Sequence, residues 1–117
     1  MTTDESPLDI ALLDENAEIG MDGFRELIDM YLVQADEILE GLQMAIAGGS
    51  AKEVNHLAHK LAGSSAVCGV KALVAPLREL EKRGRAGDLE GADELFRRIT
   101  DQLELSRHLL AEYLAGK

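Results

Sequence analysis

One amphipathic run dominates this sequence and commits a large part of the chain to a single long α-helix. Between residues 23 and 47, apolar side chains return every three or four positions, which places them on one face of an α-helix. Gly48 and Gly49 follow directly and are expected to end the helix. The apolar positions of this run are Phe24, Leu27, Ile28, Tyr31, Leu32, Ala35, Ile38, Leu39, Leu42, Ala45 and Ile46.

Similar periodicity on either side of this run predicts further helices. A short helix is expected over residues 9–17, where leucines at positions 8, 12 and 13 can close one end of a core. Longer helices are expected over residues 51–68, 70–85 and 89–113. Pro76 lies inside the third of these stretches, so it should kink that helix or delay its start.

Glycines and short polar residues mark the expected helix boundaries. A short polar side chain at an N-cap can accept a hydrogen bond from a free backbone N–H of the first turn. The expected N-caps are Asp22, Ser50 and Asp88. The glycines expected to end or separate helices are Gly20, Gly69, Gly84 and Gly87.

The composition favours an all-α fold. Hydrophobic residues make up 46% of the chain, but aromatic residues only 3%, and there are two prolines. A core of Leu, Ile, Ala and Val in 117 residues fits one domain with one modest core. We therefore predict a single domain over residues 1–117, built as an antiparallel up-and-down four-helix bundle with a short extra N-terminal helix. Residues 1–7 are expected to form a flexible tail.

The charge of the chain favours protein partners. The formal net charge of −10 would repel nucleic acids and anionic membranes, so neither is expected as a partner. No apolar run approaches the ~20 residues of a membrane span, and the acidic N-terminus does not resemble a signal peptide. Cys68 is the one cysteine and cannot form an internal disulfide, which fits a reducing compartment. We expect a cytoplasmic monomer in which Cys68 is a small buried side chain.

The helix expected over residues 51–68 carries an unusual exposed face. Val54, Leu61 and Cys68 share its apolar side, and His59 falls roughly 160° away from Leu61, so its ring should point to solvent. Gly63 follows His59 by about one turn, although glycine costs about 1 kcal/mol of helix propensity relative to alanine. Small residues beside an exposed imidazole leave room for another macromolecule to reach the ring.

The same residues resemble a known family. The segment His59-Lys60-Leu61-Ala62-Gly63-Ser64-Ser65, followed by Gly69, is similar to the signature of histidine-containing phosphotransfer (HPt) domains. The family pattern is His-x-Leu-Lys-Gly with two small residues, and with a second glycine ten positions after the histidine. This chain departs from the pattern at Ala62, where the family usually has lysine.

The resemblance implies a function for His59. In the family, one exposed histidine on a helical bundle carries a phosphoryl group, on Nε2, between aspartates of receiver domains. The implied partners are response-regulator receivers and hybrid sensor kinases, and Mg²⁺ belongs to the partner receiver rather than to this chain. No cofactor of its own and no independent kinase activity are expected. A neutral imidazole nitrogen is a suitable nucleophile for such a transfer.

Residues around His59 are the candidates for holding phosphate and docking the partner. They are Lys52, Asn55, His56, Lys60, Ala62, Gly63 and Ala66. Lys52 and Lys60 are the nearest cations in the sequence and could balance the phosphoryl charge in place of the family's lysine. His108 lies outside the motif and is interpreted as a structural or surface residue.

Two alternatives are weighed against this function. Glu53 and His56 form one Glu-x-x-His motif, but a di-iron bundle needs two such motifs and two further glutamates, all facing inward, so no metal site is predicted. The second alternative is a helical adaptor that binds a receiver or another signalling protein without phosphate chemistry. Ala62 in place of the family's lysine favours the adaptor.

Overall fold

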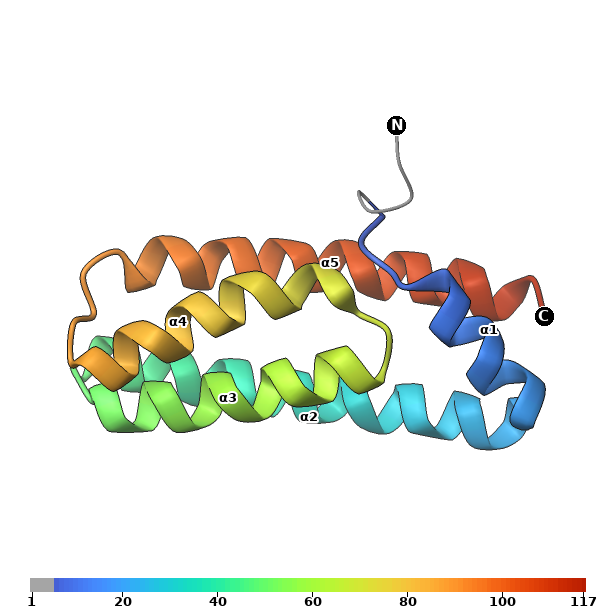
Figure 1. Cartoon of the computed structure of the whole chain (residues 1–117), viewed down its shortest axis with the longest axis horizontal. Helices are drawn as coiled ribbons and strands as arrows, with labels where there is room; N and C mark the ends of the chain where they lie inside the picture. The colour runs from blue at the N-terminus through green and yellow to red at the C-terminus, as the bar shows by residue number, and fades with distance from the viewer. Residues whose placement is uncertain (1–5) are drawn as a thin grey trace.

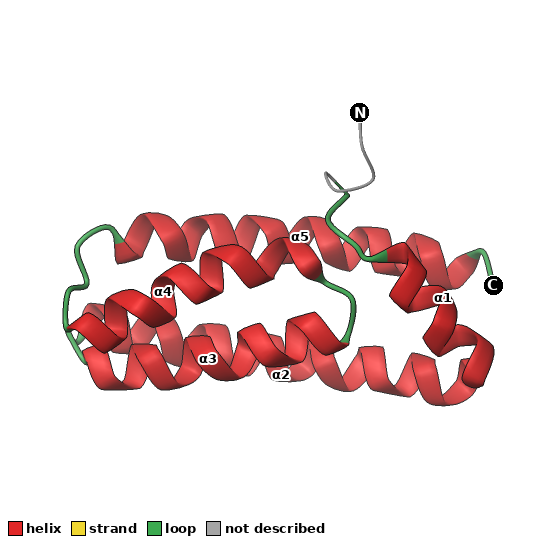
Figure 2. Ribbon diagram, in the orientation of Figure 1, coloured by secondary structure: helices red, strands yellow, loops and turns green. Residues whose placement is uncertain are grey.

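The computed structural model describes residues 6–117, which form helices joined by short connections (Figures 1 and 2). These residues contain no β-strand, and the predicted all-α class is confirmed. In Figure 1, the four longer helices lie lengthwise beside one another, and the short helix α1 (Ile10–Ile19) lies across one end. In chain order the elements are α1 (Ile10–Ile19), α2 (Met21–Ala47), α3 (Ala51–Val67), the short 3-10 helix η2 (Lys71–Leu73), α4 (Val74–Ala86) and α5 (Ala92–Ala115).

The inner faces of the helices meet in one continuous core. Most of the apolar positions predicted for α2 are buried in it, because their spacing keeps them on one side of the helix. Leu27 is an exception to the prediction, since it is exposed at the edge of that face. Cys68 is buried, as predicted. No helix within residues 6–117 combines the length and the apolar character needed to cross a bilayer.

A buried hydrogen bond joins α2 to α3. The hydroxyls of Tyr31 and Ser65 lie 2.7 Å apart, and both side chains are inside the core. Burial raises the pKa of Tyr31 to about 12, which keeps the phenol neutral and able to donate. The pair satisfies two polar groups that would otherwise be costly inside an apolar core.

The first described residues are fixed to the rest of the protein. The backbone N–H of Asp9 donates to the carbonyl of Gly69 at 2.8 Å, and the N–H of Ala72 donates to the carbonyl of Pro7 at 3.1 Å. Leu8 and Leu13 are buried in the core, as predicted, and Leu12 is half-buried. Residues 1–5 of the predicted flexible tail lie outside the described residues, whereas Pro7 is half-buried and bonded to the backbone, unlike a free tail.

Two of the predicted N-caps are wrong. The N-cap of α2 is Gly20, and Asp22 lies inside the first turn, where its charge still favours the positive end of the helix. The N-cap of α5 is Gly91, whose φ of 78° lies in the left-handed region that glycine tolerates. Asp88 instead accepts a hydrogen bond from the backbone N–H of Glu90 within the preceding loop. Ser50 is the N-cap of α3, but its side chain makes no capping hydrogen bond.

Pro76 delays the start of its helix, as one of the two predicted outcomes stated. The chain passes first through η2, and α4 begins at Val74, so Pro76 occupies the first turn. Proline is tolerated in this turn because the backbone N–H groups there have no partner inside the helix.

Gly84 lies inside α4 rather than in the predicted turn, and it allows α4 to approach α3 closely. A Cβ atom at this position would lie 2.5 Å from the backbone nitrogen of Asn55 and 2.7 Å from the carbonyl oxygen of Ala51. Any side chain larger than hydrogen would therefore push the two helices apart. Gly84 sets the separation between the helix that carries His59 and its neighbour.

Candidate functional site

His59 lies on the outer face of α3. Val54, Ala58 and Leu61 on the same helix are buried, which turns the histidine towards solvent. The His59 side chain is 67% exposed, so the predicted exposure of the imidazole is confirmed. Gly63 follows one turn later, and a Cβ atom added there would meet nothing within 4 Å. The ring therefore lies beside open space in the direction of the C-terminal end of α3.

A buried carboxylate holds one nitrogen of the His59 ring. Nδ1 of His59 lies 2.7 Å from Oε2 of Glu81, which projects from α4 and whose side chain is only 8% exposed. The close packing at Gly84 places the two helices near enough for this contact. Asn55 adds a second connection, since its Nδ2 donates to the backbone carbonyl of Glu81 at 2.9 Å.

Two arginines bond to the carboxylate of Glu81. Nη1 of Arg78 donates to Oε1 of Glu81 at 2.8 Å, and Nη2 of Arg85 donates to Oε2 at 3.3 Å. The hydrogen bond from Arg78 lowers the pKa of the Glu81 carboxyl below its ordinary value, and the bond from His59 acts in the same direction, while burial opposes both. An ionised carboxylate can only accept hydrogen bonds.

The protonation of the imidazole follows from this network. Because Glu81 accepts, we assign the ring proton of neutral His59 to Nδ1, which donates to Oε2. The lone pair of the neutral ring is then on Nε2, for which residues 6–117 provide no hydrogen-bond partner. The site thus presents one nucleophilic nitrogen outward and uses the other to fix the orientation of the ring.

Most of the predicted docking residues reach the surface, but one does not. Ala62 is completely buried, so its prediction as part of the docking surface is wrong. The reason is the packing of α4 along α3: Gly84 of α4 meets the backbone of Asn55, and Ala62 lies two turns further along that side of α3. The other six predicted residues are at least partly exposed, namely Lys52, Asn55, His56, Lys60, Gly63 and Ala66. Their role in docking remains a prediction.

The sequence reasoning missed Glu81, Arg78 and Arg85. A signal for Glu81 was available, because it occupies an apolar position in the stripe formed by Leu77, Leu80 and Gly84 in α4, all of which are buried. A carboxylate in a buried stripe needs a partner, and cations three positions before it and four after it lie on the same helix face. The third partner of Glu81 is His59, and this contact depends on the packing of α4 against α3.

An apolar groove begins at Gly63, one turn after His59 along α3. It has a volume of about 580 Å³, lies between α2 and α3, and is bordered by Gly63 at the end nearer the histidine. Leu27 and Met30 of α2 and Val67 of α3 line it, and Met30 and Val67 are each 64% exposed. Exposed apolar side chains gathered beside a reactive group are typical of a surface that binds another protein.

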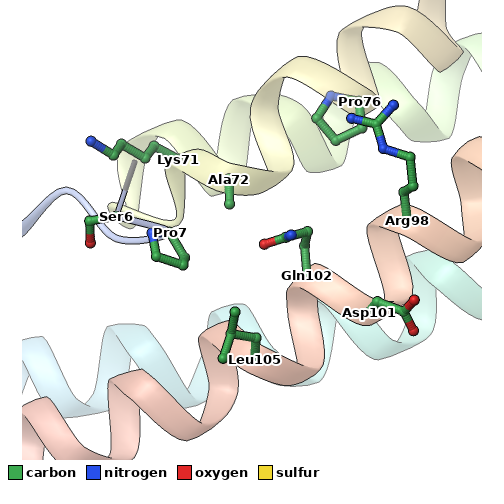
Figure 3. A pocket seen from close by; sticks show the side chains of 9 residues that line it. All are labelled: Ser6, Pro7, Lys71, Ala72, Pro76, Arg98, Asp101, Gln102 and Leu105. Atoms are coloured by element: carbon green, nitrogen blue, oxygen red, sulfur yellow. The ribbon is translucent and has the colours of Figure 1, made fainter. Parts of the chain in front are cut away.

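A second cavity lies away from this groove. Figure 3 shows it between the N-terminal segment, the start of α4 and α5, with a volume of about 530 Å³. Its polar side chains include Lys71, Arg98 and Asp101. It contains neither His59 nor any of the residues that contact His59, so it is separate from the candidate site.

The metal alternative finds no support in the geometry. Within residues 6–117, no group of three or more His, Cys, Asp or Glu side chains lies close enough together to hold a metal ion. Glu53 and His56 are both exposed, whereas a di-iron site needs its ligands to face inward.

The fold and the site together define a class of protein. It is an all-helical protein that presents one exposed histidine, held in a fixed orientation, on the face of a helix. Residues 26–109 match the family model described as the Hpt domain, and the chain belongs to that family. The chain is also similar to a solved structure, histidine-containing phosphotransfer protein B (HptB) from Pseudomonas aeruginosa PAO1. The two share 26% sequence identity with a TM-score of 0.91, over 97% of this chain and 98% of the other. No curated protein gives a significant match.

Proposed function

We propose that this chain is a histidine phosphotransfer protein that relays a phosphoryl group between receiver-domain aspartates through a phosphohistidine at His59. One observation carries the proposal: His59 is exposed, and Glu81 binds its Nδ1, which leaves the Nε2 lone pair directed away from the protein. Membership of the Hpt family supports it. The proposal includes an antiparallel up-and-down four-helix bundle with a short extra N-terminal helix, a single domain, and a cytoplasmic, monomeric protein.

The transfer step requires little chemistry from this chain. The Nε2 lone pair of neutral His59 attacks the phosphorus of an aspartyl phosphate, and the N–P bond forms as the bond between phosphorus and the aspartate oxygen breaks. The electron pair of the broken bond stays on the aspartate carboxylate. Nδ1 keeps its proton during the step, so the ring becomes positively charged beside Glu81. In-line positioning is the main requirement, and Mg²⁺ is supplied by the receiver.

The receiver is proposed to dock over the groove between α2 and α3. Gly63 borders this groove and lies one turn after His59, so a partner seated on Met30 and Val67 would pass over a residue without a side chain on its way to Nε2. Such an interface is expected to be small, at about 1,200 Å² or less, because each partner must leave after transfer.

The test is transfer of labelled phosphate from a panel of phosphorylated receivers to the purified chain. We expect acid-labile phosphate on the wild type and none on His59→Gln. The variant should remain folded, with an unfolding free energy within about 1 kcal/mol of the wild type, because the side chain is exposed and the arginines still satisfy Glu81.

His56→Gln and His108→Gln are the matched controls, since both histidines are exposed and lie outside the proposed reaction. Both should still accept phosphate, and His108→Gln should do so at the wild-type rate because it lies outside the predicted docking residues. Label that persists on His59→Gln and disappears from one of the controls would assign the phosphate to that other histidine. Binding of receivers with no acid-labile phosphate on any chain would support the adaptor function instead.

A further inference from the structure

Two oppositely charged side chains contact the same nitrogen of His59. Oε2 of Glu81 lies 2.7 Å from Nδ1, and Nη1 of Arg78 lies 3.3 Å from the same atom. Nη1 of Arg78 also donates to Oε1 of Glu81, which holds the guanidinium beside the ring. Nδ1 therefore has an acceptor next to it when it carries a proton and a donor next to it when it does not.

The proton on Nδ1 decides how reactive a phosphohistidine is. When the ring carries both the phosphoryl group on Nε2 and a proton on Nδ1, the N–P bond breaks to release a neutral imidazole, which is a good leaving group. After Nδ1 loses its proton to water, the same bond would have to release an imidazolate anion, which is a poor leaving group. The protonated form gives up its phosphoryl group readily, and the deprotonated form stores it.

We infer that Arg78 and Glu81 together set the lifetime of the phosphohistidine, with Glu81 favouring the protonated, transferable form and Arg78 donating to the Nδ1 lone pair of the stored form. This inference rests on the proposed function for its biological use. It also makes Arg78, on α4, the cation that lies beside the phosphohistidine. Ala62, which replaces the family's lysine, is buried, and within residues 6–117 neither Lys52 nor Lys60, the cations expected from the sequence, bonds to His59.

No other charged group in the described residues touches the ring. Arg85 of α4 contacts Glu81 but not His59, and it therefore acts on the imidazole only through the carboxylate. On α3, His56 and Lys60 are exposed neighbours of His59. Arg78 and Glu81 are both positioning residues, because each acts on the phosphoryl group through Nδ1.

The experiment measures the decay of phosphohistidine directly. The chain carrying His56→Gln and His108→Gln has His59 as its sole histidine, and phosphoramidate can load it without any receiver. The decay is followed by ³¹P NMR at one pH, and the protonation of Nδ1 by ¹⁵N NMR of the labelled ring. A purely structural role for either residue would not move the ¹⁵N signal in the expected direction.

The two substitutions should act with opposite signs. Arg78→Ala should shorten the lifetime about two- to fivefold and shift the ¹⁵N signal towards the protonated ring, as expected from removing one partly exposed charge. Glu81→Gln should lengthen the lifetime by a similar factor and shift the signal the other way, since the amide oxygen still fills the site without its charge. Arg78→Lys, which keeps the cation, should restore a lifetime within about twofold of the parent chain.

Lys82→Ala is the matched control, because it removes one exposed positive charge from the same helix at a residue with no contact to the ring, and its lifetime should equal that of the parent. The inference is overturned if Arg78→Ala decays no faster than the control, if both substitutions shift the lifetime in the same direction, or if phosphoramidate does not load His59. Normal loading by phosphoramidate with no transfer from any receiver would overturn the proposed function and leave the inference intact.

Discussion

At the scale of single residues, Gly84 has the largest expected effect on the geometry around His59. Gly84→Ala places a methyl group against the backbone of Asn55 and Ala51, at distances that real Cβ atoms do not adopt. We expect the unfolding free energy to fall by about 1 to 3 kcal/mol, because overpacking outweighs the gain in helix propensity. Urea unfolding monitored by circular dichroism measures the change.

Gly63→Ala is the matched control for that substitution. Gly63 also lies in a helix, but a Cβ atom there meets nothing within 4 Å, so the variant should gain up to about 1 kcal/mol from helix propensity alone. If Gly84→Ala were as stable as Gly63→Ala, the close approach of α3 and α4 would not depend on glycine.

The residues around His59 divide into those that the sequence could and could not reveal. The exposure of His59 and the burial of Val54 and Leu61 follow from the geometry of one helix, and the sequence predicted both. Ala62 and Glu81 depend on a second helix. A helix projection counts angles around one axis, so it cannot show that α4 covers Ala62 or that it brings a carboxylate to Nδ1.

At the scale of elements, the hydroxyl pair between α2 and α3 should behave as a coupled unit. Tyr31→Phe leaves the Ser65 hydroxyl buried without its partner, and Ser65→Ala does the same to the phenol, so each should cost about 1 to 3 kcal/mol. The double variant should be less destabilised than the sum of the two, because no buried polar group is left unpaired. Urea unfolding of the four chains gives the coupling, and strict additivity would contradict it.

Element boundaries show the same division between local and distant causes. The existence and order of the helices follow from periodicity, and Pro76 acts where it was expected. Ser50 is the N-cap of α3, as predicted, but without the side-chain hydrogen bond that an N-cap can accept. Asp22 and Asp88 have suitable side chains for N-caps, yet the helices begin elsewhere. The loop before α5 uses glycine in the left-handed region to reverse the chain, and Asp88 is already engaged within that loop. The same residues are compatible with more than one start of each helix, and the packing of the helices determines which start is used.

At the scale of the whole molecule, phosphate acceptance and receiver docking should be separable. Met30→Glu puts a charge in the groove between α2 and α3, where an apolar partner surface is proposed to bind. Transfer from a phosphorylated receiver should fall about tenfold or more, as for loss of an interface anchor. Loading of His59 by phosphoramidate should not change, because the imidazole and its contacts on α4 remain intact.

Met44→Glu provides the control on the same helix. Met44 is 70% exposed, close to the 64% of Met30, but it does not line the groove and lies about 21 Å further along α2. Transfer to this variant should match the wild type. An equal loss in both variants would show that added negative charge, rather than the groove, controls the reaction.

The thiol of Cys68 can report on the occupancy of the groove in the unaltered chain. Cys68 is the single cysteine of the chain, it lines the groove, and it is buried at the C-terminal end of α3. Burial raises the pKa of its thiol, so alkylation at neutral pH requires the C-terminal end of α3 to open. A protein bound in the groove would keep that end closed. The rate of Cys68 alkylation would then fall as the fraction of occupied grooves rises.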